Sequence, residues 1–167
     1  MAEDFKGNGE GAGPAADTLQ QLIVNAQYIK DFSFENPRAP QSLFQQSGPP
    51  EVEINVDVKA RNLNPDNYEV VLSVNSTARS GGEPVFIVEL EYAAVVTVRN
   101  TPEAALPAMI LVETPRIIFP FARAIIANAT RDGGFPPLMI NPIDFAELLR
   151  RQQQPIPLGV PPGGAVV

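Results

Sequence analysis

Apolar and polar residues alternate along four stretches in the first hundred residues. The clearest is 51–59, which reads EVEINVDVK and has a valine or isoleucine at every second position. A period of two residues is typical of a β-strand with one face buried and the other in water. The stretches 21–35, 68–79 and 85–99 repeat this pattern. The chain is therefore predicted to open with four strands.

The alternation assigns each strand a buried face and an open face. The predicted buried faces consist of Leu22, Val24, Ala26, Tyr28, Phe32, Phe34, Val52, Ile54, Val56, Val58, Tyr68, Val70, Leu72, Val74, Ala78, Phe86, Val88, Leu90, Tyr92, Ala94, Val96 and Val98. The open face mixes acidic residues with Ile23, Ile29, Val85 and Ile87. Turn residues at 62–67 and 80–84 suit connections between antiparallel strands.

The period changes after Arg99. Prolines at 102, 107, 115 and 120 argue against a strand interior there. Apolar residues now recur at helical spacing, at Ile118, Phe121, Ala122, Ile125 and Ala129. The sequence Asp-Gly-Gly at 132–134 predicts the end of this helix, because glycine tolerates the left-handed backbone that follows a helix.

A second helix is predicted from Asn141, with Asn141 as the N-cap and Pro142 at the first helical position. Its buried side would consist of Phe145, Leu148 and Leu149. Strands followed by helices indicate an α+β fold. We therefore expect a four-stranded antiparallel sheet with helices packed on one face.

The two ends of the chain differ from the middle. Residues 1–17 are small and acidic, and residues 155–167 are rich in proline and glycine, so both are predicted to be flexible tails. The folded domain is expected at 18–154. The long proline-rich loop 37–50 carries Leu43 and Phe44, and long loops with apolar anchors often cover a groove. Alternatively, Phe44 only plugs the core.

Composition excludes several classes of site. The 167 residues include no His, Cys or Trp, which rules out catalytic triads, thiol chemistry, disulfides and imidazole or thiolate metal sites. The net charge of −7 argues against nucleic-acid binding. The sequence has no phosphate-loop motif and no calcium-loop spacing, so we expect no cofactor and no bound metal. No apolar run approaches the roughly 20 residues of a membrane span, and a cytoplasmic protein without membrane insertion is expected.

Carboxylates are the remaining candidates for chemistry. Asp31 and Glu35 would lie roughly 13 Å apart along one strand face, and Glu89 and Glu91 roughly 7 Å apart. A hydrolase would need one such carboxyl in a pocket that raises its pKa. A solvated sheet face explains these residues more simply, and the apolar residues among them favour a binding or assembly protein over an enzyme.

Six segments in order resemble the SecB family of export chaperones. They are YIKDFSFENP with AP following, PEV, YEVVL, IFPFAR, GFPPL and NPIDF, and they span about Gln21 to Leu149. The resemblance implies a SecB-like fold in a homotetramer built as a dimer of dimers. It also implies ATP-independent binding of unfolded secretory precursors in the cytosol and their delivery to the SecA motor.

The same resemblance assigns residues to three roles. SecA binding falls to Asp31, Glu35, Ile87 and Glu89, which the alternation independently puts on the open face. Client binding falls to Leu43, Phe44, Phe121, Ile125 and Phe135. Assembly falls to Phe86, Val88, Leu90 and Tyr92, which alternatively pack beneath the helices as ordinary core.

Two alternatives stay open at this point. A SecB-like chaperone serving a toxin–antitoxin pair belongs to the same class, and the sequence has no feature that separates it from an export chaperone. A carboxylate hydrolase belongs to a different class and is disfavoured for the reasons given above.

Overall fold

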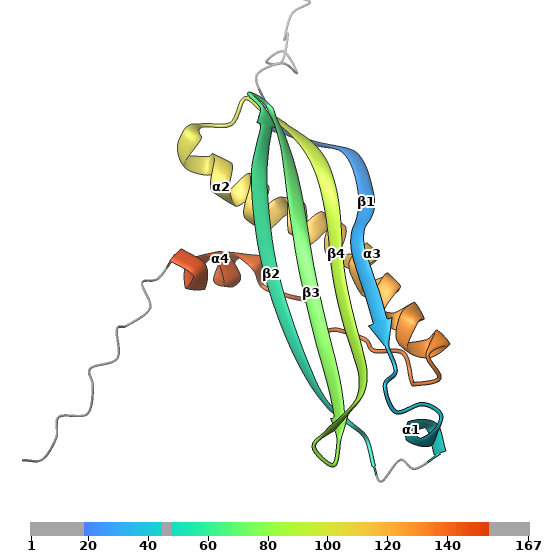
Figure 1. The fold of residues 1–167 in the computed structure, drawn as a ribbon. Coiled ribbons are helices and arrows are strands. Elements are labelled where there is room, and N and C mark those ends of the chain that lie inside the picture. Colours follow the sequence, from blue (N-terminus) through green and yellow to red (C-terminus); the bar gives the residue numbers. More distant parts are fainter. Residues whose placement is uncertain (1–18, 45–47, 154–167) are drawn as a thin grey trace, which may run out of the picture.

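A computed structural model describes residues 19–44 and 48–153 and contains a four-stranded antiparallel sheet (Figure 1). Its strands are β1 (Gln21–Glu35), β2 (Glu51–Asn64), β3 (Asn67–Ser80) and β4 (Glu83–Arg99), in the order β1-β4-β3-β2. The predicted strands are confirmed, and β2 runs five residues beyond Lys59 so that only Pro65 and Asp66 separate it from β3. The predicted tails at 1–17 and 155–167 lie outside the described residues.

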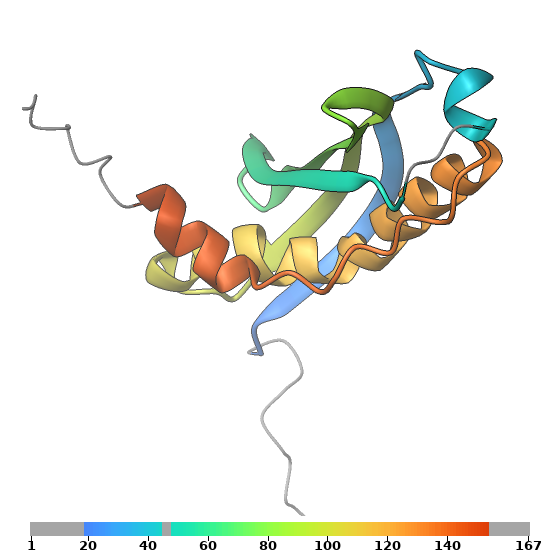
Figure 2. The same cartoon turned by 90° about the horizontal axis from the view of Figure 1, so that it is seen from below.

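In the described part of the chain, five helical segments follow the sheet in the sequence and cover one of its faces (Figures 1 and 2). They are η2 (Glu103–Ala105), α2 (Leu106–Ala108), the π-helical turn η3 (Met109–Glu113), α3 (Thr114–Asp132) and α4 (Phe145–Gln153). A short helix, α1 (Gln41–Phe44), interrupts the connection between β1 and β2. The α+β fold with helices on one sheet face is thereby confirmed.

The core lies between the sheet and α3. The side chains of Leu72, Val88, Leu90 and Ile126 are essentially inaccessible to solvent. Phe119 of α3 packs edge-on against Phe145 of α4, with ring centroids 5.9 Å apart. Phe145 is only 1% exposed. Its contact with Phe119 therefore attaches the last helix to the layer that covers the sheet.

Three predictions about strand faces in β1 were wrong, all for the same reason. Register shifts at Asn25 and Lys30 in β1 are β-bulges, and each bulge reverses the face on which the next residue lies. Ala26 and Tyr28 therefore lie on the open face, opposite Val95 and Ala93, and Ile29 lies on the helix side opposite Tyr92. Residues after the second bulge return to their predicted faces.

Val85 was also predicted on the open face and is instead 5% exposed. A further register shift separates Ala78 from Arg79 in β3, at the level of Val85 in β4. Val85 lines a small cavity together with Ser42 and Phe135. The open face therefore retains Ile23 and the half-buried Ile87 as its apolar residues from that set.

The predicted helix around Ile118 is confirmed, but its start and its buried stripe differ. Helical structure begins before Pro115 and Pro120, and Pro120 lies inside α3. The π-helical turn η3 precedes Pro115, and the Thr114 hydroxyl donates to the Met109 carbonyl at 3.0 Å. Phe121 is 51% exposed, whereas Phe119 and Ile126 are buried.

The start of the last helix was predicted too early. Residues 141–144 are neither helix nor strand, and α4 begins at Phe145. Asp144 caps it, because the Glu147 backbone N–H donates to the Asp144 carboxylate at 3.0 Å and lowers its pKa. Phe145 is buried as predicted, and Leu148 and Leu149 pack against the core while partly exposed.

Gly133, just after α3, makes a close approach that predicts an effect on stability. A Cβ added there would lie 2.2 Å from Cζ of Phe34, and the ring of Phe34 stacks on Phe86. Gly133→Ala is therefore expected to displace Phe34 and to destabilise the fold by about 1–2 kcal/mol. Urea unfolding measures the change. Gly81→Ala meets no atom within 4 Å but has a positive φ of 61°, so it is the control for backbone strain without a clash. An unchanged midpoint in Gly133→Ala would contradict this packing.

Candidate functional site

The open sheet face carries a group of carboxylates on β1 and β4. We define the acidic surface as Asp31, Glu35, Glu89 and Glu91 together with Ile87. Glu35 lies directly opposite Ile87, and Asp31 directly opposite Glu91. Glu89 lies opposite Ser33, between these two pairs. The structure thus brings together all four residues predicted for SecA binding.

The geometry of the acidic surface favours a cationic ligand. Adjacent strands lie roughly 5 Å apart and alternate residues of one strand roughly 7 Å apart, so these carboxylates repel one another. Asp31, Glu35 and Glu89 are exposed, and Ile87, opposite Glu35 at one end of the acidic surface, adds an apolar contact. A basic segment with an apolar side chain would relieve the repulsion and cover Ile87.

A buried carboxylate lies beside the acidic surface and was missed by sequence analysis. Glu69 of β3 is 4% exposed, although it lies on the open face. Its carboxylate accepts hydrogen bonds from the Arg61 guanidinium at 2.5 Å, from the Tyr28 hydroxyl, and from the Lys30 ammonium at 3.0 and 3.1 Å. We call these four residues the Glu69 cluster.

The bulges in β1 make the Glu69 cluster possible. Strand β4 lies between β1 and β3, so Tyr28 and Lys30 must cross it to reach Glu69. Ala93 of β4 lies opposite Tyr28 and is completely buried, which indicates that larger side chains cross above it. The sequence carried one signal for this cluster. Strict alternation places Tyr28 in the core, where its polar hydroxyl group would need a hydrogen-bond partner.

The Glu69 cluster predicts a pH dependence of stability. Hydrogen bonds from Arg61 and Tyr28 lower the pKa of Glu69 from 4.5 to about 2. A lowered folded-state pKa contributes stability above pH 4.5 that is lost as the pH falls toward 2. Because Arg61 is 64% exposed, screening reduces this contribution to about 1–2 kcal/mol. Urea unfolding measures the free energy of unfolding of the wild type and of Glu69→Gln at pH 5 and at pH 2.5. Between these two pH values the wild type should lose about 1–2 kcal/mol more than Glu69→Gln. Equal losses would contradict the prediction.

An apolar groove lies on the helix side of the sheet, between β2 and the segment after α3. Its volume is about 520 Å³, and its lining includes Pro50, Val52, Phe86, Phe135, Leu138 and Met139. Val52 is 39% exposed and Met139 57% exposed, so both present apolar surface to solvent. The rings of Phe86 and Phe135, with centroids 5.0 Å apart, form its aromatic wall.

The position of the groove depends on how the chain leaves α3. Gly134 adopts a positive φ of 91°, and the Phe135 N–H donates to the Thr130 carbonyl at 3.0 Å. The buried Thr130 hydroxyl then accepts a hydrogen bond from the Leu138 N–H at 2.9 Å. These contacts hold the segment 135–140 against α3, with Phe135 turned inward and Met139 outward.

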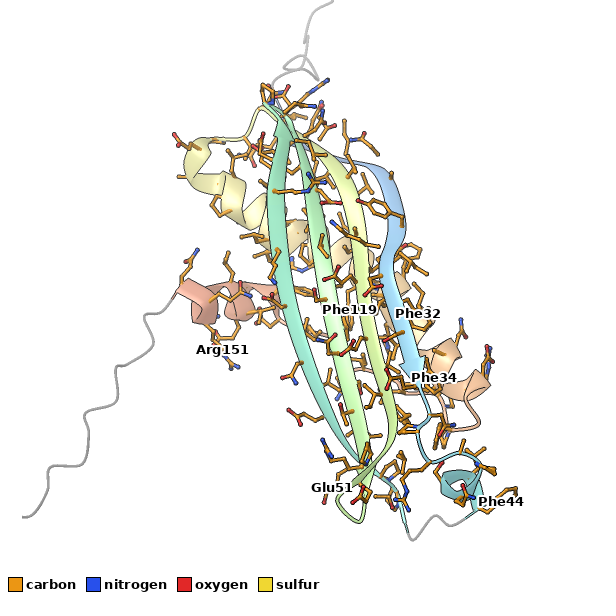
Figure 3. The ribbon with its side chains drawn as sticks, in the orientation of Figure 1. Phe32, Phe34, Phe44, Glu51, Phe119 and Arg151 are labelled. Atoms are coloured by element: carbon orange, nitrogen blue, oxygen red, sulfur yellow. The ribbon has the colours of Figure 1, made fainter. Side chains whose placement is uncertain are left out.

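The predicted client-binding residues occupy separate places. Phe135 lines the apolar groove, although its side chain is 6% exposed. Leu43 lies against Gly134, and Phe44 is 84% exposed on α1, where Figure 3 shows it projecting from the end of the molecule. Phe121 and the half-buried Ile125 lie on α3 and are not part of the groove lining.

The four residues predicted for assembly, Phe86, Val88, Leu90 and Tyr92, all lie on the helix-facing side of β4 and are at most 8% exposed. They therefore pack in the core of the single chain, as in the alternative given above. The exposed apolar residues near α3 are different ones, namely Ile117 and Phe121 of α3 and Ile29 and Phe32 of β1.

Neither a metal centre nor a membrane span is found in the described part of the chain. Within residues 19–44 and 48–153, acidic side chains do not gather into a set that could hold a metal ion. The described helices are also too short or too polar to cross a bilayer.

Sequence comparison identifies the family. The model of the family described as "Preprotein translocase subunit SecB" matches residues 15–155. The chain is 50% identical over 147 residues to the protein-export protein SecB of Bradyrhizobium diazoefficiens, covering 88% of this chain and 91% of that protein. It is 50% identical over 156 residues to the protein of that name from Rhodospirillum centenum, covering 91% and 92%.

Comparison of folds agrees with the sequence. The SecB-like chaperone of Mycobacterium tuberculosis, solved in complex with an antitoxin peptide, superposes with a TM-score of 0.61 over 73% of this chain and 90% of that one. At 15% identity this likeness shows the shared fold alone. The sequence relatives and the family model together show that the chain belongs to the SecB family of protein-export chaperones.

Proposed function

We propose that this chaperone captures unfolded secretory precursors in its apolar groove without ATP and passes them to SecA through its acidic surface. The observation that carries the proposal is the separation of the two surfaces. Exposed Val52 and Met139 line the groove on the helix side, while Asp31, Glu35 and Glu89 lie on the open sheet face. A client and a motor protein can therefore be bound at the same time.

Capture by the groove needs no chemical energy. An unfolded chain exposes apolar side chains, and covering them yields roughly 25 cal/mol for each Å² removed from water. The groove is lined by apolar side chains and is open to solvent at Val52 and Met139, so it accepts many side chains. Leu43 and Phe44 on α1 lie close to the groove and extend the apolar surface available to a client.

Transfer would use charge. The net charge of −7 and the carboxylates of the acidic surface suit a basic segment. By resemblance to the family, that segment is the zinc-bearing C-terminal part of SecA. The zinc then belongs to the partner.

Assembly into a homotetramer is part of the proposal. The exposed apolar side chains of Ile117 and Phe121 on α3 and of Ile29 and Phe32 on β1 support it, because exposed apolar patches are normally interfaces. This arrangement gives Phe121 a role in assembly beside the client-binding role that the resemblance implies. We place the chaperone in the cytoplasm, where precursors are still unfolded.

The other candidate functions have less support. The toxin–antitoxin alternative rests on the fold shared with the mycobacterial chaperone, whereas the relatives at about 50% identity are protein-export proteins. The carboxylates of the hydrolase alternative lie on an open sheet face. We therefore propose binding and transfer without catalysis.

The absence of tryptophan from the chain provides a sensitive test. A tryptophan-containing precursor is diluted from denaturant with and without the chaperone, and its emission reports folding of the precursor alone. The expected result is arrested folding without ATP, and release when SecA is added. Folding at the unassisted rate would contradict capture, and capture without release by SecA would contradict transfer.

A further inference from the structure

Lys30 lies where it could neutralise the acidic surface. It directly precedes Asp31 in β1, and it shares a pocket of about 210 Å³ with Glu69 and Glu91. A lysine side chain is long and flexible, so its ammonium group can reach carboxylates in several directions. In the structure both bonds from its ammonium go to Glu69, at 3.0 and 3.1 Å.

We propose that Glu69 is a positioning residue for the acidic surface. Its carboxylate on β3 holds the ammonium group of Lys30, so that Asp31 and Glu91 stay unneutralised for a basic partner. The inference rests on the proposed docking of SecA at this surface. Glu69 lies outside the docking site and yet controls the charge that this site presents to its partner.

The contacts of Glu69 explain why its hold on Lys30 is firm. Arg61 of β2 and Tyr28 of β1 donate to the same carboxylate from two sides, so the carboxylate cannot rotate away. The bulge at Lys30 leaves this residue without a cross-strand partner, and its side chain extends over β4 instead. Burial of the Glu69 carboxylate further favours the ion pair, because few water molecules compete for it.

Loss of the Glu69 carboxylate would release Lys30 toward Asp31 and Glu91. An exposed ion pair of this kind weakens the attraction of the surface for a cation by a factor of about two to five. We therefore expect Glu69→Gln to bind the zinc-loaded C-terminal segment of SecA two- to fivefold more weakly than the wild type, as measured by calorimetry. Uptake of an unfolded precursor should not change.

A second substitution distinguishes positioning from a merely structural role. Glu69→Gln combined with Lys30→Gln has the net charge of the wild type and lacks the released cation, so binding of the SecA segment should be restored. The control combines Glu69→Gln with Arg61→Gln, which has the same net charge but keeps Lys30, and binding should remain weak. Equal binding by the two double variants would overturn the proposal.

A direct measurement on Lys30 does not depend on SecA. Acylation of the chaperone with an amine reagent, followed by peptide mass spectrometry, should show Lys30 reacting severalfold faster in Glu69→Gln than in the wild type. Lys59, at 78% exposed, is the internal reference. Unchanged Lys30 reactivity would overturn the proposal even if SecA binding fell. If the wild type itself fails to bind the SecA segment, the proposed docking fails while this result still stands.

Glu69→Asp provides a variant closer to the native protein if Glu69→Gln does not fold. It keeps the charge but shortens the side chain, so the contact with Lys30 across β4 should break. Faster acylation of Lys30 and weaker binding of the SecA segment are again expected. Unchanged reactivity in this folded variant would likewise overturn the proposal.

Discussion

The variant Asp31→Lys with Glu35→Lys is expected to lose binding of the zinc-loaded C-terminal segment of SecA by at least about 100-fold. Both residues lie on the exposed face of β1, and Glu35 lies directly opposite Ile87. Reversal replaces two attractions with two repulsions, and like charges brought together at an interface cost several kcal/mol. Calorimetry at two salt concentrations measures the loss and its electrostatic origin.

A matched control separates this site from overall charge. Glu51→Lys with Glu53→Lys makes the same change in net charge on the other edge strand, β2, where both residues are exposed. It should bind the SecA segment within a few-fold of the wild type. Uptake of unfolded precursor should survive in the β1 variant. Equal loss in both variants would contradict a specific acidic surface.

The second large effect is expected in the apolar groove. Val52→Thr with Met139→Gln keeps the side-chain shapes nearly unchanged but introduces polar groups at two exposed positions of the lining. A client side chain would bury these groups without hydrogen-bond partners, at a cost of roughly 1–3 kcal/mol each. Affinity for an unfolded precursor should therefore fall by at least about 30-fold.

The control for the groove uses the same chemistry elsewhere. Ile23→Thr with Leu63→Gln changes residues that are 44% and 40% exposed and do not line the groove. This variant should arrest precursor folding as well as the wild type does. SecA binding should be unaffected in the groove variant. Normal capture by Val52→Thr with Met139→Gln would contradict the proposed client site.

The parts of the fold that the sequence predicted are those with an unbroken period. β2, β3 and β4 alternate without interruption over most of their lengths, so their faces could be assigned residue by residue. In β1 the bulges at Asn25 and Lys30 each consume one residue, and the pattern around Tyr28 is too mixed to reveal them. Strict alternation therefore placed Ala26, Tyr28 and Ile29 on the wrong faces.

The helical layer was less predictable because proline has two roles. Pro115 and Pro120 look like helix breakers in the sequence, but the wide turn η3 precedes the first and α3 contains the second. Asn141 resembled an N-cap, yet Asp144 three residues later makes the capping hydrogen bond. Local signals indicated the existence of both helices, whereas packing against the sheet decided where they begin.

The candidate site divides in the same way. The acidic surface followed from alternation and from the family motif, although the pairing of Glu35 with Ile87 needed the register of β1 on β4. Val52 and Met139 carried no signal as groove residues. Alternation placed Val52 on a buried face, and the segment 135–140 has no period that shows which side chains face outward. The Glu69 cluster joins three strands and depends on a bulge, so tertiary structure alone reveals it.

A chaperone of this kind should hold unfolded precursors and not folded ones. Light scattering is measured on the purified protein, alone and after addition of a slowly folding precursor. We expect a particle near four times the chain mass of 18.0 kDa, which gains the mass of the unfolded precursor without ATP and does not bind the folded form. A particle that gains no mass from the unfolded precursor would show that the chain does not capture precursors.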